Sequence, residues 1–192
     1  MTADKHLAAL QAHWKRHKAF PPMAKLTEVL GLASTGGVFK VLGRLTEAGY
    51  LERVDGRIAP TKRFFERRVL GSVRAGLPQP AGQEDLDDRL SVEDYLVEHP
   101  ERTSYCHVRG DSMKDAGLLD GDVVVVEANT LPRPGDIVVA VVDDQVTVKY
   151  LRMDTAGAWF LVPANPAYEP IRPTGSLEVL GVVTGSFRRY RR

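Results

Sequence analysis

A serine and a lysine in this chain stand in settings that suit nucleophilic catalysis. Ser112 lies in the tight run Gly110-Asp111-Ser112-Met113, and Lys149 lies 37 positions later inside the largely apolar run of residues 146–151. Burial in such a run lowers the pKa of a lysine, and a neutral lysine can take the proton of a serine hydroxyl. Because serine–lysine pairs are a known variant of the serine nucleophile, the two residues predict a peptidase with Ser112 as nucleophile and Lys149 as base.

Both residues also have a purely structural interpretation. A serine after Gly-Asp is commonly a turn residue, and a lysine in a strand commonly points to solvent. Alternation along the strand puts Lys149 on the side of Thr147 and not with the valines. Taken one at a time, the residues therefore leave the catalytic and the structural interpretation open.

The remaining reactive side chains do not predict a metal or cofactor site. The candidate ligands are His6, His13, His17, His99, His107 and Cys106. Their spacing matches no metal-binding pattern, and His13 and His17, four apart on one helix, lack an evident third ligand. We expect no metal and no cofactor.

The composition of the 192 residues limits the class of protein. One cysteine rules out an intramolecular disulfide and suits a reducing compartment. No apolar run approaches the roughly 20 residues that a membrane span needs, and no signal peptide is evident. The chain is expected to be cytoplasmic, without a membrane partner.

The net charge of +1 hides an asymmetry. Residues 1–70 carry 13 Lys and Arg against 6 Asp and Glu, whereas residues 71–192 carry 13 against 19. Opposite charge on two segments predicts two modules, of which the basic one suits a polyanion such as DNA. The alternative is that the positive charge only keeps a small domain in solution.

The basic segment predicts a winged helix-turn-helix domain over residues 1–62. Three short amphipathic helices are expected, the third over residues 34–48 with the apolar stripe Val38, Val41, Leu42 and Leu45. Asp55-Gly56 between two short β-prone runs then predicts a hairpin. Residues 63–70 are expected to be a linker.

The third helix would enter the major groove of duplex DNA with its N-terminus first. The candidate DNA-binding residues are Ser34, Thr35, Gly36, Gly37, Lys40, Arg44 and Arg57. Hydroxyls and cations can bind bases or phosphates, and glycines permit close approach of the backbone. A solvated charge at each arginine, or a winged helix used for protein contacts, is the alternative.

The pattern of residues 71–192 predicts β structure. Short apolar runs at residues 123–126, 137–142 and 145–151 are separated by turn signals such as Asp143-Asp144. They predict a compact β-barrel or sandwich with little helix. The whole chain is therefore expected to be an α+β protein of two domains, the second mostly β.

Four blocks of this second segment resemble the LexA/UmuD family of self-cleaving proteins. Residues 108–122 are similar to the nucleophile segment of the family, residues 143–151 to its lysine segment, and residues 161–166 to a further family element. Residues 69–78 are similar to its cleavage segment, which puts the cut bond between Ala75 and Gly76. The blocks occur in family order, and together they are a far more specific signal than Gly-Asp-Ser-Met alone.

The resemblance implies an SOS-type transcriptional repressor that switches itself off. Such a protein binds operator DNA as a homodimer, in association with the nucleoid, and cuts its own Ala75–Gly76 bond when stimulated by the RecA filament on single-stranded DNA. The N-terminal segment is similar to the DNA-binding domain of LexA, although Gly36, Gly37 and Phe39 depart from its commonest recognition helix. This departure leaves the operator sequence open.

Three alternatives remain at this point. The stretch at residues 90–100 is closer to UmuD, which would make the chain an accessory protein of a translesion polymerase, although UmuD proteins lack the N-terminal domain. A phage-type inducible repressor would share the same blocks. A binding module with an inactive peptidase domain is disfavoured because Ala75-Gly76, Ser112 and Lys149 are all intact.

Overall fold

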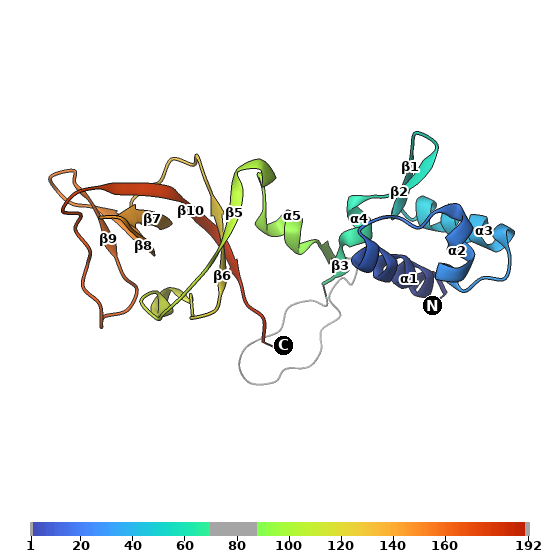
Figure 1. Ribbon diagram of the computed structural model, residues 1–192, viewed down its shortest axis with the longest axis horizontal. Coiled ribbons are helices and arrows are strands. Elements are labelled where there is room, and N and C mark those ends of the chain that lie inside the picture. The colour runs from blue at the N-terminus through green and yellow to red at the C-terminus, as the bar shows by residue number, and fades with distance from the viewer. Residues whose placement is uncertain (1, 70–87, 191–192) are drawn as a thin grey trace. The chain divides into compact units, whose positions relative to one another are not determined.

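The computed structural model describes residues 2–69 and 88–190, and it mixes helices with strands (Figure 1). The chain separates into two compact units, Met1–Val92 and Glu93–Arg192. The first unit holds most of the helix, whereas the second is mostly strand, so the α+β class expected from the sequence is confirmed.

Three helices open the first unit: α1 (Thr2–His17), α2 (Met23–Leu30) and α3 (Thr35–Glu47). Local signals set their ends. Gly31 closes α2 in the left-handed conformation at φ 62°, and the Ser34 side chain accepts a hydrogen bond from the Gly37 N–H at 3.2 Å to cap α3. The third helix thus lies where the sequence predicts it.

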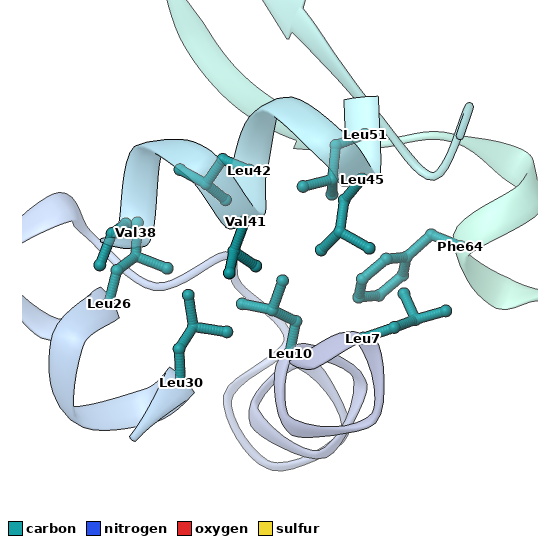
Figure 2. Packing of buried hydrophobic residues seen from close by; sticks show 10 residues of the cluster. All are labelled: Leu7, Leu10, Leu26, Leu30, Val38, Val41, Leu42, Leu45, Leu51 and Phe64. Carbon is teal, nitrogen blue, oxygen red and sulfur yellow. The ribbon is translucent and has the colours of Figure 1, made fainter. Parts of the chain in front are cut away.

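The three helices pack around one apolar core (Figure 2). Leu10 of α1 and Leu26 of α2 are fully buried, and the predicted stripe of α3 faces them. The ten core residues are Leu7, Leu10, Leu26, Leu30, Val38, Val41, Leu42, Leu45, Leu51 and Phe64. Apolar residues at helical spacing therefore decide how α3 is oriented and which of its side chains remain outside.

A two-residue hairpin follows the helices. Strands β1 (Leu51–Val54) and β2 (Arg57–Pro60) are antiparallel, with Val54 opposite Arg57. The turn residues Asp55 and Gly56 both have positive φ, 50° and 76°, as the Asp-Gly turn of a twisted hairpin requires. The predicted hairpin is confirmed, and the order of elements is consistent with a helix-turn-helix head.

Residues 63–70 contain more structure than the linker predicted there. Helix α4 (Lys62–Phe65) puts Phe64, 1% exposed, into the core of the first unit. Strand β3 (Arg67–Arg68) then pairs with β4 (Arg89–Leu90). The many charges of this segment conceal Phe64, whose burial favours an ordered helix here.

The second unit is built on one six-stranded antiparallel sheet (Figure 1). Its strands are β5 (Thr103–His107), β6 (Val123–Glu127), β7 (Ile137–Val142), β8 (Gln145–Met153), β9 (Trp159–Val162) and β10 (Leu177–Phe187). The strand order is β5-β6-β10-β7-β8-β9, so the last strand lies in the middle of the sheet. Short helices α5 (Val92–Leu96), η1 (Pro100–Arg102) and η2 (Lys114–Ala116) complete the described part.

Apolar side chains lie on both sides of the central strands. Along β7, Val139 joins one core cluster, while Val138 and Ala140 join the other. This two-sided burial explains why β6 and β7 read as continuous apolar runs rather than as alternating patterns. The sequence predicts a barrel or sandwich; the structure has a single sheet, because β10 enters between β6 and β7.

Gly181 allows β10 to approach its neighbour β6 closely. A Cβ atom there would lie 2.7 Å from the Glu127 carbonyl oxygen of β6. Register shifts beside Gly181 and Gly185 bend the strand against its neighbours. No helix in the described residues is long and apolar enough to cross a membrane.

Candidate active site

Ser112 lies in the loop between β5 and η2. Two buried residues, Val108 and Met113, anchor this loop in an apolar cluster of the second unit. Gly110 takes a φ of 83°, and its N–H donates to Asp120 Oδ1 at 2.8 Å. The sequence run Gly-Asp-Ser-Met thus forms a turn that is held on both sides of the serine.

A second segment, residues 164–168, holds the same turn from the C-terminal part of the chain. Ala164 N–H donates to the Ser112 carbonyl at 2.8 Å. Asn165, 3% exposed, donates from Nδ2 to the Asp111 carbonyl at 3.1 Å and to its carboxylate at 3.2 Å. Tyr168 also donates to the Asp111 carboxylate, and this hydrogen bond lowers the pKa of Asp111. Asp111 is therefore a structural brace of the turn.

Lys149 lies on β8, opposite Val138 of β7, and is 7% exposed. Its Nζ is 2.8 Å from Ser112 Oγ, 2.9 Å from Thr147 Oγ1 and 2.9 Å from the Val148 carbonyl oxygen. Desolvation by burial lowers the pKa of the lysine. No carboxylate among the described residues forms an ion pair with it.

These three contacts suit the neutral amine. A neutral lysine has two N–H donors and one lone pair. Thr147 Oγ1 and the Val148 carbonyl can accept the two N–H groups, which leaves the lone pair for the hydroxyl proton of Ser112. The arrangement can therefore activate Ser112 as a nucleophile by general-base catalysis.

A cavity of about 250 Å³ opens onto this pair. Its walls include the end of β5, strand β8 and the loop that carries Ser112 (the nucleophile loop). Cys106, Arg109 and Val146 are among the lining residues. Among the described residues, no acceptor takes the backbone N–H of Ser112, so it is available to a developing oxyanion. Ala75 and Gly76, the predicted cleavage bond, lie outside the described residues.

An ion pair ties the last strand to the loop that follows the serine. Asp122, 1% exposed, accepts from Arg188 Nε at 2.5 Å and from Arg188 Nη2 at 2.6 Å. The same Nη2 donates to the Gly117 carbonyl at 3.1 Å. The guanidinium lowers the pKa of Asp122, and the carboxylate raises the pKa of Arg188. Arg188 is thus a structural anchor of the loop that ends at Asp122.

Comparison with known proteins agrees with this geometry. The model of the Peptidase S24-like family matches residues 68–184, which includes Ser112 and Lys149. The LexA repressor of Carboxydothermus hydrogenoformans is 31% identical over 198 residues, covering 97% of this chain and 96% of that protein. The LexA repressors of Alcanivorax borkumensis and Oleidesulfovibrio alaskensis are 34% and 35% identical, covering 88% and 89% of this chain.

The chain belongs to the LexA repressor family. Its membership covers the helical unit as well as the peptidase domain, because the match to a LexA repressor extends over nearly the whole of both proteins. The chain is accordingly an SOS-type transcriptional repressor with a self-cleaving serine peptidase domain. The resemblance seen in the sequence is confirmed.

Sequence reasoning missed three residues of the LexA-family site. Strand alternation places Thr147 beside Lys149, but it did not predict the hydrogen bond between them. Asn165 and Tyr168 gave no such signal, because their contacts to Asp111 span 54 and 57 positions. Asn165 lies within the family block at residues 161–166, whereas Tyr168 lies just after it.

The predicted DNA-binding residues extend from the N-cap of α3 to its last turn and include one residue of the hairpin. Lys40 and Arg44 of α3 and Arg57 of β2 are exposed, and none of them forms an ion pair with a described residue. Thr35 and Gly36 are exposed as well, and Gly37 is half-buried. Ser34 Oγ already accepts the capping hydrogen bond, which leaves its hydroxyl proton to offer to DNA.

The described residues contain no group of three or more His, Cys, Asp or Glu side chains that could hold a metal ion. The rings of His13 and His17 lie 4.4 Å apart on α1, with no acidic or sulfur ligand grouped with them among those residues.

Proposed function

We propose that this LexA-family chain represses transcription as a homodimer on operator DNA and inactivates itself by cutting its Ala75–Gly76 bond with Ser112 and Lys149. The observation that carries the proposal is the 2.8 Å contact between a buried Lys149 Nζ and Ser112 Oγ. A charged lysine at this depth would lack a carboxylate partner, so the neutral base is favoured. If Ser112 were only a turn residue and Lys149 only a strand residue, this contact would not be needed.

In the first step, Ser112 Oγ attacks the carbonyl carbon of Ala75 while its proton passes to Lys149 Nζ. The oxyanion that forms is stabilised by backbone N–H groups of the nucleophile loop, with that of Ser112 available. The intermediate then breaks the C–N bond, and the lysine returns the proton to the amine of Gly76. The acyl group remains on the serine.

In the second step, water attacks the ester between Ala75 and Ser112. Lys149 takes a proton from this water and returns it to the serine oxygen, which restores the pair. One water is consumed, and the products are a helical fragment that ends at Ala75 and a fragment that begins at Gly76. Because the substrate bond belongs to the same chain, its effective concentration at the serine is high.

We propose a winged helix-turn-helix head at residues 1–62, a short connection at 63–70 whose helix α4 packs on the head, and a peptidase and dimerisation domain at 71–192. Two heads on a two-fold operator bind with avidity, which cleavage between head and dimerisation domain abolishes. The loss can reach about 10² to 10⁴-fold in affinity. Removal of avidity is the physical basis of derepression.

The RecA filament on single-stranded DNA is proposed as the stimulus, and the nucleoid in the cytoplasm as the place of action. Family membership supports both parts of the proposal. The chain's similarity to LexA repressors over the helical unit, which UmuD proteins lack, favours the repressor over the polymerase accessory role.

The test is the mass of the fragments. The full-length chain is incubated at alkaline pH, and separately at neutral pH with RecA filament and ATP, beside the variants Ser112→Ala and Lys149→Ala. We expect two fragments that meet between Ala75 and Gly76 from the parent chain and none from either variant. A cut elsewhere, or a cut that survives Ser112→Ala, would refute the assignment.

A further inference from the structure

The exposed face of α3 carries one large apolar side chain. Phe39 is 56% exposed, although its neighbours Val38 and Leu42 are buried in the core. Gly36 and Gly43 lie on the same exposed face, one turn on either side, and the space where their side chains would stand is empty. Phe39 and Lys40 are thus the two long side chains that project from the middle of the helix.

Phe39 also forms part of the wall of an apolar groove of about 420 Å³ in the first unit. The groove runs between the start of α2, the outer side of α3 and the hairpin β1–β2. Its apolar walls include Phe20, Met23, Phe39 and Ile58. Leaving such a surface in water costs free energy that a bound partner would recover.

The charges at the groove indicate which partner fits. Its lining includes two arginines, Arg53 and Arg57, and no carboxylate. Lys40 and Arg44 extend the cationic surface along α3. Arginines that flank an apolar groove beside a recognition helix are complementary to duplex DNA, which presents phosphates around the thymine methyl groups of the major groove.

We propose that Phe39 is a specificity-determining residue that packs on the 5-methyl group of one thymine in the operator. This inference rests on the proposed DNA binding of the head and adds the base feature that it reads. The glycines at 36 and 43 let the helix approach the base edges, so that the phenylalanine ring reaches the methyl group. Phosphate contacts by Arg53 and Arg57 would fix the position of the helix without selecting sequence.

The proposal predicts a requirement for one methyl group. Duplex sites are first selected from a randomised pool with the full-length chain, and each thymine of a selected site is then replaced singly by deoxyuridine, which differs only by the methyl group. We expect the dissociation constant of the parent chain to rise about fourfold at one position in each half-site, the equivalent of one buried methyl group. At that position Phe39→Ala should bind thymine and deoxyuridine equally.

The control variant is Thr46→Ala, which changes an exposed residue of the same helix and should keep the methyl dependence. Phe39→Leu retains an apolar side chain and should keep part of the methyl dependence. This variant keeps the test valid if Phe39→Ala fails to fold. Thermal unfolding of all variants is measured alongside.

Two results would overturn the proposal and leave the proposed DNA binding intact. In the first, no deoxyuridine substitution changes the affinity of the parent chain, as expected if the groove binds a protein. In the second, Phe39→Ala keeps the dependence on the methyl group. Failure of the parent chain to enrich any site would instead refute the proposed DNA binding, and this inference with it.

Discussion

Lys149 and Ser112 are 37 positions apart, and their Nζ and Oγ atoms lie 2.8 Å from each other. The lysine reaches the serine from a strand, whereas the serine lies on a loop braced by Asp120 and by residues 164–168. Since no ion pair with a described carboxylate holds the lysine in place, its position depends on hydrogen bonds to Thr147 and Val148.

The rate of self-cleavage should rise with pH. Burial lowers the pKa of Lys149, and only the neutral amine can accept the serine proton, so the reactive fraction grows as pH approaches the folded pKa and levels off above it. Fragment formation between pH 6 and 10.5 should rise up to about tenfold per pH unit and then reach a plateau. A rate that falls over this range would contradict the assignment of Lys149 as base.

Thr147→Val should slow cleavage by about tenfold at the plateau, because it removes one acceptor that orients the amine while keeping the shape of the side chain. The loss of this acceptor from the ammonium form should also shift the pH profile to lower pH. Thr155→Val, in the exposed turn after β8, is the matched control and should behave as the parent chain. A profile that keeps its midpoint would show that Thr147 acts only in packing.

Arg188→Ala should lower the unfolding temperature of the second unit, since it leaves the buried Asp122 carboxylate without its charged partner. Calorimetry of the full chain measures the change. Arg189→Ala alters the exposed neighbour and should leave the unfolding temperature within about 1 °C. Equal unfolding temperatures for the two variants would count against an anchoring role of Arg188.

Asp143 should stabilise the fold less as the pH falls. Its carboxylate accepts hydrogen bonds from the N–H groups of Thr174, Gly175 and Ser176, which lower its pKa to about 2. A lowered folded pKa means that the stabilisation is complete above the unfolded value of 3.8 and disappears as pH falls through about 2.

Asp143→Asn tests this relation, because asparagine tolerates the left-handed backbone at that position. The difference in unfolding free energy between the parent chain and the variant should be largest at neutral pH and should shrink below pH 4. Asp144→Asn, in the same turn, is the control and should change the unfolding free energy less at neutral pH, because the N–H groups of residues 174–176 donate to Asp143. A difference in unfolding free energy that stays constant from pH 2 to 7 would show that the charge of Asp143 does not contribute to stability.

Local signals predicted much of the first unit. Asp55-Gly56 can form a two-residue turn from its own backbone preferences, and the stripe of Val38, Val41, Leu42 and Leu45 specifies both a helix and its buried face. The connector at residues 63–70 was predicted less well, because the burial of Phe64 depends on a core whose other members, such as Leu7 and Leu10, lie far away in the sequence. Likewise, the single sheet could not be derived from strand runs, since the insertion of β10 between β6 and β7 is a long-range choice.

The sequence by itself determined the residue types, the turns, the helix faces and the family blocks that make Ser112 and Lys149 a candidate pair. Only the tertiary structure decided that Lys149 is buried and 2.8 Å from Ser112, that Asn165 and Tyr168 brace Asp111, and that Arg188 neutralises Asp122. Propensities and periodicities act over a few neighbouring residues. Burial and hydrogen-bond geometry arise only when the sheet order brings residues 37 to 66 positions apart into contact.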